Sequence, residues 1–218
     1  MPVLSPAQAR AVYDRVGASQ DRQAWYEDAA VDQAVAHAAF GSARAVVEVG
    51  CGTGRLAARL LARELPPDAR LTASDPSPVM AGLARRRLAA WAGRAGVVEA
   101  FGVPDVAPGS ADRVVAAYVL DLLSDADARR VVADARRALA PGGRLVLAGL
   151  SAGTGPLSRT VAAGWRAVWG VRPSWVGGCR PVEVGPLLDG RLWEVVHHGR
   201  VAPWGVPSES LVAVRRPG

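Results

Sequence analysis

Apolar runs and helical spacings alternate along residues 44–150 of this 218-residue chain. The first run, Ala45 to Val49, is short, rich in valine and followed by glycine, which is typical of a buried parallel strand. Helical or turn-forming segments separate four further strand-like runs, at residues 71–74, 97–101, 113–119 and 145–148. This alternation predicts βαβ units, and therefore an α/β fold in which a parallel sheet has helices on both faces.

Local signals mark where several of the predicted helices begin and end. Ser77-Pro78 is typical of an N-cap followed by proline at the first helical position, and Ser124 opens the helix after the fourth strand. The sequence Pro141-Gly142-Gly143 is a stop signal for that helix. Near the start of the chain, Ser5 to Gln8 resembles a capping box, and we expect helices in most of residues 5–40.

The end of the chain departs from this alternation. Residues 191–201 and 208–215 are strand-like, and the turn-rich stretch between them is too short for a crossover helix. We therefore expect the two strands to pair antiparallel, which gives a doubly wound sheet of about seven strands, mostly parallel. An insertion at residues 151–190, which contains Gly, Pro and Trp, precedes them and is the candidate substrate region.

The composition excludes several classes of protein. Half of the residues are hydrophobic, but no apolar run approaches the ~20 residues that span a bilayer, so we expect no transmembrane segment. The start of the chain lacks the basic and apolar stretches of a secretory signal, which favours a cytoplasmic protein. Cys51 and Cys179 stand alone, without a CxxC motif or a nearby histidine pair, and predict neither a disulfide framework nor a metal site.

The net charge of +6 would ordinarily suggest nucleic acid as a partner, because clustered Lys and Arg neutralise phosphates. The chain contains no Lys, Asn or Ile, while Ala and Arg are abundant, a pattern typical of the codon bias of a GC-rich genome. Arg is also scattered along the predicted helix faces rather than gathered in one patch. We therefore predict that nucleic acid is not a partner.

A glycine-rich loop after the first strand carries the main functional signal. Glycines alternate in the sequence Glu48 to Gly54, which permits a tight turn and lets a ligand lie against bare backbone. The N–H groups at the start of the following helix favour a carboxylate or a phosphate. Asp75, at the end of the next strand and 21 residues after Gly54, can accept hydrogen bonds from both hydroxyls of a ribose.

Glycine spacing alone leaves two classes of cofactor open. From Gly52 to Ala57 the loop also satisfies the loose nicotinamide-dinucleotide pattern, with Asp75 at about the expected distance. A NAD-dependent oxidoreductase is therefore an alternative to an enzyme that binds another nucleoside cofactor. The absence of any Lys, and so of a Tyr-x-x-x-Lys pair, counts against the oxidoreductase.

Four sequences, in the right order, resemble the class I S-adenosylmethionine (SAM)-dependent methyltransferases, especially the type 11 branch that includes ubiquinone and menaquinone biosynthesis enzymes. They are VVEVGCGTG at 46–54, SDPSPVM at 74–80, GSADRVVAAYVLDLL at 109–123 and RRALAPGGRLVLAGL at 136–150. The resemblance implies a Rossmann-like fold, SAM as the cofactor and S-adenosylhomocysteine (SAH) as the product. We then expect a single methyltransferase domain in four parts: a helical N-terminal lid (1–43), a cofactor-binding core (44–150), the insertion (151–190) and a C-terminal strand pair (191–218).

Carried onto this sequence, the resemblance implies which residues bind each part of SAM. Residues of the loop would surround the methionine part and line the cofactor site: Glu48, Gly50, Cys51, Gly52 and Gly54. Asp75 would hold the ribose, although a role as a helix cap is the alternative. Either Met80 or Pro76 would lie near the adenine, and core packing is the alternative for Met80.

Residues at the ends of the third and fourth strands complete the implied site. Ala100 and Phe101 stand where the family usually has an Asp-Ala pair that lines the adenine pocket. This departure leaves the polar contact to the adenine amino group unaccounted for; Phe101 either stacks on the base or packs in the core. By the same resemblance, Ala117 and Tyr118 would face the reacting centre, with a backbone carbonyl available to the methionine ammonium.

A catalytic base is optional for this chemistry, because the methyl group of SAM is already activated and the enzyme mainly aligns the acceptor and excludes water. Where the acceptor is a phenol or a carbon acid, a base with a pKa near the working pH helps. The candidates are Asp121, Tyr13, Tyr26 and His37. Each has a plainer interpretation: Asp121 as a helix cap, the tyrosines as half-buried packing, and His37 as a surface helix residue.

The sequence specifies the acceptor least. Trp165 and Trp169 are one helical turn apart, so they either line a pocket for a small hydrophobic or aromatic acceptor or pack the insertion onto the sheet. Arginines interleave with the tryptophans of this region, a pattern also compatible with an interfacial helix in peripheral contact with acidic phospholipids. A phospholipid N-methyltransferase, and a SAM-binding protein that does not transfer the methyl group, are therefore alternatives.

Overall fold

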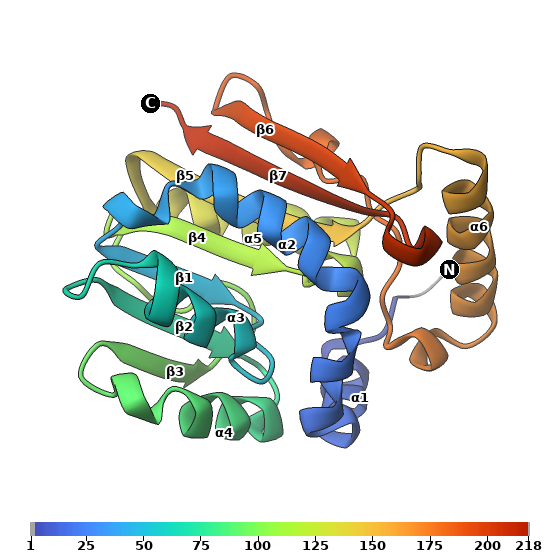
Figure 1. Ribbon diagram of the computed structural model, residues 1–218, viewed down its shortest axis with the longest axis horizontal. Coiled ribbons are helices and arrows are strands. Elements are labelled where there is room, and N and C mark those ends of the chain that lie inside the picture. Colours follow the sequence, from blue (N-terminus) through green and yellow to red (C-terminus); the bar gives the residue numbers. More distant parts are fainter. Residues whose placement is uncertain (1–2, 218) are drawn as a thin grey trace.

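The computed structural model describes residues 3–217, and its centre is a seven-stranded sheet with the strand order β3-β2-β1-β4-β5-β7-β6 (Figure 1). The strands are β1 (Ala45–Val49), β2 (Arg70–Asp75), β3 (Ala95–Glu99), β4 (Ala111–Ala117), β5 (Leu139–Leu150), β6 (Trp193–Val201) and β7 (Ser208–Arg215). Strands β1 to β5 pair parallel, and β7 pairs antiparallel with both β5 and β6. The predicted α/β doubly wound fold and the antiparallel C-terminal strand pair are confirmed.

Helices cover both faces of the sheet. They are α1 (Pro6–Val16), α2 (Ala24–Ala38), α3 (Arg55–Arg59, extended by a π-helical turn over Leu60–Glu64), α4 (Pro78–Arg87), α5 (Asp125–Ala138) and α6 (Pro156–Val171). Val46 and Val115 point to the face covered by α2 and α3, whereas Val47 and Val114 point to the face covered by α5. The strand period of two thus explains why the central strands are apolar throughout.

The N-terminal helices occupy two different positions. Ser5 caps α1 through the predicted capping box, in which the Gln8 N–H donates to Ser5 Oγ at 3.3 Å and the Ser5 N–H donates to Gln8 Oε1 at 2.9 Å. A 3-10 turn over Gly17–Gln23 links α1 to α2, and α2 packs across β5, β6 and β7. The first turn of α2, the linking turn and α1 therefore lie near the carboxyl ends of the strands, where a lid would lie, and the rest of α2 runs away from them (Figure 1).

Several strand boundaries differ from those expected. β3 and β4 each begin and end two residues earlier than predicted, because pairing with the neighbouring strands sets their ends; Glu99, for example, lies opposite Asp75. β5 begins at Leu139, so the predicted helix stop at residues 141–143 lies inside the strand, where the pairing with β4 is irregular and Gly142 has a φ of +77°. The stop signal is therefore a kink at the start of β5.

The insertion at residues 151–190 contains α6 and short 3-10 turns. The indole N–H groups of Trp165 and Trp169 donate to the backbone carbonyls of Cys179 at 2.9 Å and Gly178 at 3.0 Å, which fastens α6 to the loop that follows it. Neither tryptophan lines the two cavities described below, so the structure supports packing for both. Within residues 3–217, no helix has the length and apolar character needed to cross a membrane.

Candidate functional site

Three glycines at alternate positions bend the loop between β1 and α3 sharply. Gly50, Gly52 and Gly54 have φ angles of +63°, +53° and +76°, in the left-handed region that glycine adopts without strain. A Cβ atom at Gly50 would lie 2.5 Å from the Val119 side chain, and one at Gly54 would lie 3.0 Å from the Ala84 backbone. The loop therefore approaches α4 and the end of β4 more closely than a side chain allows.

Asp75 lies beside this loop at the carboxyl end of β2. Its Oδ2 accepts a hydrogen bond from the Gly52 N–H at 2.9 Å, and its Oδ1 accepts one from the Ser77 N–H at 2.9 Å. Burial raises the pKa of Asp75, while these two N–H groups oppose the rise. Asp75 does not cap α4, because Ser77 Oγ accepts the Met80 N–H at 3.1 Å. Both carboxylate oxygens keep lone pairs for a ligand.

A cavity of about 460 Å³, which we call the α1 cavity, opens in front of Asp75 and beneath α1. Residues at and after the ends of β1 to β4 form its floor: Val49, Gly50, Asp75, Pro76, Ser77, Phe101, Gly102, Ala117, Tyr118 and Val119. Val3, Leu4 and Pro6 give its cover an apolar surface. Loops far apart in the sequence meet here because parallel strands end at the same edge of the sheet.

The α1 cavity contains only some of the residues predicted near the adenine. Pro76 and Phe101 line it, whereas Met80 is fully buried in the core and Ala100 does not reach the wall. Of the two candidates on β2 and α4, the structure thus brings Pro76 and not Met80 to the cavity. Gly102 lines the same wall, although no chemical signal in the sequence marks it as a site residue.

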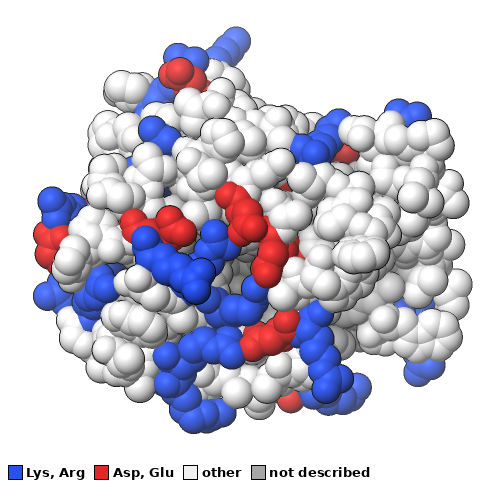
Figure 2. All heavy atoms as spheres, viewed as in Figure 1, with Lys and Arg blue, Asp and Glu red and all other residues white. Residues whose placement is uncertain are grey.

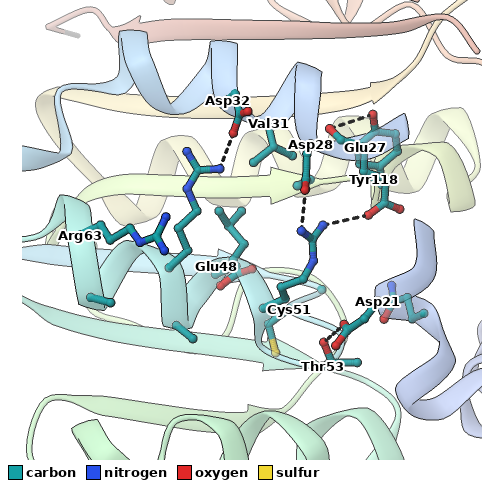
Figure 3. Close-up of a pocket in the computed structure, with 18 of the residues that line it drawn as sticks. Asp21, Glu27, Asp28, Val31, Asp32, Glu48, Cys51, Thr53, Arg63 and Tyr118 are labelled. Carbon is teal, nitrogen blue, oxygen red and sulfur yellow. Dashed lines mark hydrogen bonds and ion pairs between the residues drawn. The ribbon is translucent and has the colours of Figure 1, made fainter. Parts of the chain in front are cut away.

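A second cavity, of about 650 Å³, lies between α2 and α3, and we call it the charged cavity (Figure 3). Acidic side chains from α2, the turn before it and β1 line it: Asp21, Glu27, Asp28, Asp32 and Glu48. Arginines of α3 and its π-helical extension face them: Arg55, Arg59 and Arg63. In the space-filling view, side chains of both signs surround a hollow in the middle of this face (Figure 2).

Ion pairs connect the two walls of the charged cavity. Arg55 Nη1 donates to Asp28 Oδ1 at 2.6 Å, and Arg55 Nη2 lies 3.5 Å from Glu27 Oε2. One turn further along both helices, Arg59 pairs with Asp32. The acids are four residues apart on α2 and the arginines four apart on α3, so the helical period places each set on one face.

The glycine-rich loop is also fastened to the turn before α2. Thr53 Oγ1 donates to Asp21 Oδ1 at 2.6 Å, and Arg87 of α4 pairs with the same carboxylate, with 2.6 Å between Nη2 and Oδ2. Gln20 of this turn occupies the space next to Gly52, where a Cβ atom would lie 2.4 Å from Gln20 Oε1. The N-terminal segment therefore forms part of the site.

Two buried oxygen atoms near the loop lack a hydrogen-bond partner among residues 3–217. They are Oε2 of Glu48, a residue that is only 3% exposed, and Oε1 of Gln20. Both residues line the charged cavity. A buried oxygen without a partner costs about 1–3 kcal/mol, so these two atoms indicate that hydrogen-bond donors of a ligand or of water belong in this cavity.

Two carboxyl groups of the charged cavity have pKa values near neutrality. Burial raises the pKa of Glu48 to about 8, and the nearby carboxylate of Asp75 adds to the rise. Burial also raises the pKa of Glu27 to about 7, with Arg55 opposing the rise and Asp28 adding to it. A cation bound between these groups would keep both ionised.

The two cavities share four wall residues: Gln20, Gly50, Ala117 and Tyr118. Tyr118 has a φ of +55°, an unfavourable value for an aromatic residue, of the kind that clusters at functional sites. Its N–H donates to the Ala148 carbonyl at 2.7 Å, and its hydroxyl donates to Ser208 Oγ at 2.9 Å, so β5 and β7 hold this turn in place. A ligand at the shared wall contacts both cavities.

The two tyrosines predicted as bases lie near this shared wall. Tyr13 lines the α1 cavity, and its hydroxyl is 3.7 Å from Cys179 Sγ. Tyr26 packs edge-on against Tyr118, with ring centroids 5.8 Å apart. Burial raises the pKa of both tyrosines, so they stay neutral near pH 7. A neutral phenol donates or accepts a hydrogen bond but does not act as a base.

Asp121 and His37, the other two candidates, lie outside both cavities. Asp121 is fully buried and accepts the Leu150 N–H at 2.7 Å, and burial raises its pKa. It does not cap α5, a role that Ser124 has. His37 is exposed near the end of α2, where its ring stacks on His197 with centroids 3.8 Å apart. Because α2 runs back towards the start of β1, the structure does not bring His37 to the other candidates.

Comparisons with known proteins give one sequence match and many structural ones. Residues 47–145 match the family model described as "Methyltransferase domain". The [4+2]-cyclase SpnF has a TM-score of 0.75 and 16% identity, over 100% of this chain and 99% of that one. The Burkholderia thailandensis 1,6-didemethyltoxoflavin-N1-methyltransferase, solved with 1,6-didemethyltoxoflavin and SAH, has a TM-score of 0.68 and 20% identity, over 100% and 93%.

A third structure is a chain from the complex of the Haloferax volcanii Trm112 methyltransferase activator with its partner. It has a TM-score of 0.71 and 15% identity, over 96% of this chain and 98% of that one. No curated protein matches the chain. At these identities the solved structures establish a shared fold and nothing more. The evidence for a methyltransferase domain is the sequence match over residues 47–145.

Proposed function

We propose that this chain, whose residues 47–145 match a methyltransferase domain, is a class I SAM-dependent methyltransferase that transfers the methyl group of SAM to an oxygen, nitrogen or carbon atom of a small hydrophobic or aromatic acceptor. One observation carries the proposal. A cavity with the carboxylate of Asp75 in its floor meets a cavity lined by Glu48 and Arg55, and the end of β4 belongs to both walls. The neutral nucleoside of SAM suits the first cavity, and its zwitterionic methionine part suits the second.

We assign the nucleoside to the α1 cavity. The lone pairs that remain on Asp75 can accept hydrogen bonds from the ribose hydroxyls. Phe101 lines this cavity and is 45% exposed, a state that stacking on the adenine would relieve. Pro76 adds an apolar wall beside Asp75. None of these residues is a polar partner for the adenine amino group, so Phe101 would contribute most of the binding to the base.

We assign the methionine part to the charged cavity. The unpartnered Oε2 of Glu48 suits the ammonium group, and Gln20 Oε1 offers a second acceptor. Arg55, which Asp28 holds at 2.6 Å, suits the carboxylate. Both orphaned oxygens would then have donors, so the residues present fit the cofactor that the family uses. Gly50 and Cys51 line this cavity and would provide the backbone beneath, whereas Gly52 and Gly54 line neither cavity and would shape the loop.

The residues of this chain then position the acceptor and exclude water. SAM supplies an activated methyl group, so the protein must mainly hold the acceptor in line with it. The turn at Tyr118, fixed by Ala148 and Ser208, would orient the reacting end of the cofactor. The apolar side chains of α1 and the residues before it would cover the centre from solvent.

For an acceptor that loses a proton, we propose Glu27 as the proton acceptor. Its carboxylate projects from the first turn of α2 into the charged cavity, where Oε2 lies 3.5 Å from Arg55 Nη2. Figure 3 shows Glu27 beside Tyr118. Its pKa of about 7 suits proton transfer near neutral pH. Tyr13 and Tyr26 would orient the acceptor through hydrogen bonds or packing. Asp121 would act only through the backbone that it holds at Leu150.

The acceptor class rests on the cover of the α1 cavity. Val3, Leu4 and Tyr13 face this cavity from above, and Leu122 lines it next to them. An apolar cover of this kind favours a hydrophobic or aromatic molecule over a sugar or a charged polymer. The Burkholderia enzyme, whose acceptor is the small molecule 1,6-didemethyltoxoflavin, has the same fold. SpnF, a [4+2]-cyclase, also has it, so the SAM-binding alternative without methyl transfer needs a test of its own.

The test is methyl transfer from SAM labelled in the methyl group to four sets of acceptors, with the label followed into each product. The sets are phenols and quinols, aromatic amines, phosphatidylethanolamine vesicles and transfer RNA. We expect label in the small aromatic compounds. Label mainly in the phospholipid would instead support the phospholipid N-methyltransferase. Tight SAH binding without label in any acceptor would support the SAM-binding alternative, and tight NADH binding without SAH binding would support the oxidoreductase.

A further inference from the structure

The outward surface of α6 is apolar and is not covered by other described residues. Only Ser158 and Ala162 are buried in this helix, and Trp165 and Trp169 pack on the same side. The exposed positions are mostly uncharged; Leu157 is 69% exposed and Val171 is 80% exposed. The ribbon shows α6 standing at the edge of the molecule, beside the loop between β6 and β7 (Figure 1). The helix thus offers an unpartnered apolar side to its surroundings.

Two exposed tryptophans extend this surface at both ends of α6. Trp175, in the turn after α6, is 66% exposed. Trp204 is 84% exposed, in the turn between β6 and β7 that packs against the start of α6; a Cβ atom at the neighbouring Gly205 would lie 3.5 Å from Leu157. Trp204 also has a φ of +54°, an unfavourable value for a bulky residue. The fold therefore presents this indole to the outside at an energetic cost.

The charge of the same segment has one sign. Between residues 151 and 182 the chain has four arginines and no acidic residue. Arg180 pairs with Asp125 in the body of the protein, whereas Arg159 and Arg166 are exposed on α6 and form no ion pair with another residue between 3 and 217. In the space-filling view, the side of the molecule that α6 occupies is largely uncharged, with scattered basic groups (Figure 2). A surface helix without a partner usually carries both signs of charge.

We infer that the α6 surface, formed by α6, Trp175 and Trp204, docks on an anionic membrane. An apolar side flanked by cationic side chains and exposed indoles has the features of a helix that lies in the interface of a bilayer. Nucleic acid would pair with the arginines but would leave Val171 and Leu157 exposed. A second copy of this chain would bring arginines against arginines. An anionic lipid surface satisfies the charge and the apolar side together.

Docking would also bring the N-terminal cover of the α1 cavity towards the membrane. The loop that follows α6 packs against the N-terminal segment, because a Cβ atom at Gly178 would lie 2.7 Å from the Leu4 side chain, and Tyr13 contacts Cys179. Leu4 and Tyr13 line the α1 cavity. A hydrophobic molecule dissolved in the bilayer could then reach that cavity directly. The docking itself does not depend on methyl transfer, and the following test uses the full chain without SAM.

The test is sedimentation with sucrose-loaded vesicles of phosphatidylcholine containing either 30% phosphatidylserine or none. We expect the chain to sediment with the anionic vesicles at least tenfold more strongly than with the neutral ones, and to be released by 0.5 M salt. Arg159→Glu combined with Arg166→Glu should weaken this binding at least tenfold. The matched control is Arg86→Glu combined with Arg130→Glu, which changes net charge equally on exposed residues of α4 and α5 and should weaken binding less than threefold. Trp204→Ser should weaken binding about fivefold without unfolding, because this side chain is exposed.

Three results would overturn the inference. The first is no binding to anionic vesicles even in low salt. The second is equal weakening by the α6 pair and by the control pair, which would indicate a general effect of net charge. The third is a concentration-dependent dimer in analytical ultracentrifugation that Val171→Glu abolishes, since a second copy would then cover the α6 surface. Failure of methyl transfer in the acceptor assay has no bearing on any of these results.

Discussion

The two cavities at the carboxyl ends of the strands differ in chemistry although they share a wall. The α1 cavity has apolar side chains above and the carboxylate of Asp75 in its floor, whereas the charged cavity has five acidic and three basic residues in its wall. A cofactor with a neutral nucleoside at one end and a zwitterion at the other needs both environments. This difference predicts that loss of the Asp75 carboxylate weakens every adenosine ligand, and that loss of the Arg55 guanidinium weakens only ligands with an amino-acid tail.

The largest effect should come from Asp75→Ala, which removes the acceptor of the ribose hydroxyls. Loss of two hydrogen bonds to a charged acceptor, each ~1.5–3 kcal/mol, should weaken SAH and 5′-methylthioadenosine alike, by at least ~100-fold. Isothermal titration calorimetry measures both affinities. Asp127→Asn, in the wall of the same cavity, is the control and should change them less than threefold. Unchanged affinity in Asp75→Ala would contradict the ribose assignment.

A smaller and more selective effect should come from Arg55→Gln. Loss of one charge-assisted contact to the methionine carboxylate, ~1.5–3 kcal/mol, should weaken SAH at least tenfold and leave 5′-methylthioadenosine, which has no amino-acid tail, within twofold. Arg59→Gln, one turn further along the cavity and paired with Asp32, is the matched control. If Arg55→Gln weakened both ligands equally, its effect would be on the loop and not on the tail.

Glu48 should make the free energy of unfolding depend on pH. Burial raises its pKa to about 8 from 4.5, so the folded protein keeps a proton that the unfolded chain loses. Its contribution to stability is therefore complete below about pH 4.5 and is lost as the pH rises through about 8. With ~1.4 kcal/mol per pKa unit, Glu48→Gln should raise the free energy of unfolding at pH 8.5, relative to wild type, by at least ~1 kcal/mol. Urea unfolding at pH 5 and pH 8.5 measures this difference.

The same carboxyl group should release a proton when SAH binds at pH 7, because the ligand ammonium favours the ionised form. The binding enthalpy should then differ between phosphate and Tris buffers for wild type and not for Glu48→Gln. Equal buffer dependence in both proteins would show that another group releases the proton. Glu27, which has a pKa of about 7, would then be the next residue to substitute.

The smallest effect on SAH affinity should come from Tyr118→Phe, which tests the shared wall. It leaves the fully buried Ser208 without its 2.9 Å hydrogen bond, a loss of ~1–3 kcal/mol. The melting temperature should fall by ~2–8 °C, while SAH affinity changes less than threefold. A large loss of affinity with an unchanged melting temperature would instead place the hydroxyl in contact with the ligand.

The difference between the two cavities also explains which parts of the site the sequence predicts. The α1 cavity is built at strand ends, where local signals such as the glycine loop and Asp75 occur, and Pro76, Phe101, Ala117 and Tyr118, which the sequence also proposed, line it. Met80 lies outside the cavity, because it is fully buried in the core after the N-cap at Ser77. Sequence position alone does not reveal which side of a short helix faces a cavity.

The charged cavity depends on pairing between two helices that are separate in the sequence. Arg55 and Asp28 are 27 residues apart, and their contact follows from how α2 crosses the sheet. The four-residue spacing of charged side chains within each helix can be read from the sequence, but it is equally typical of solvated helix faces. His37 looked suitable by residue type, yet the direction of α2 takes it to the other end of the sheet. Chemistry at strand ends is therefore predictable here, and chemistry between helices is not.

The most direct test of this account is a crystal structure of the chain with SAH bound. We predict that the ribose hydroxyls lie within hydrogen-bond distance of Asp75, and that the amino-acid tail passes Gly50 and Tyr118 to end between Glu48 and Arg55. An amino-acid tail that stayed in the α1 cavity, or a nucleoside between α2 and α3, would contradict it.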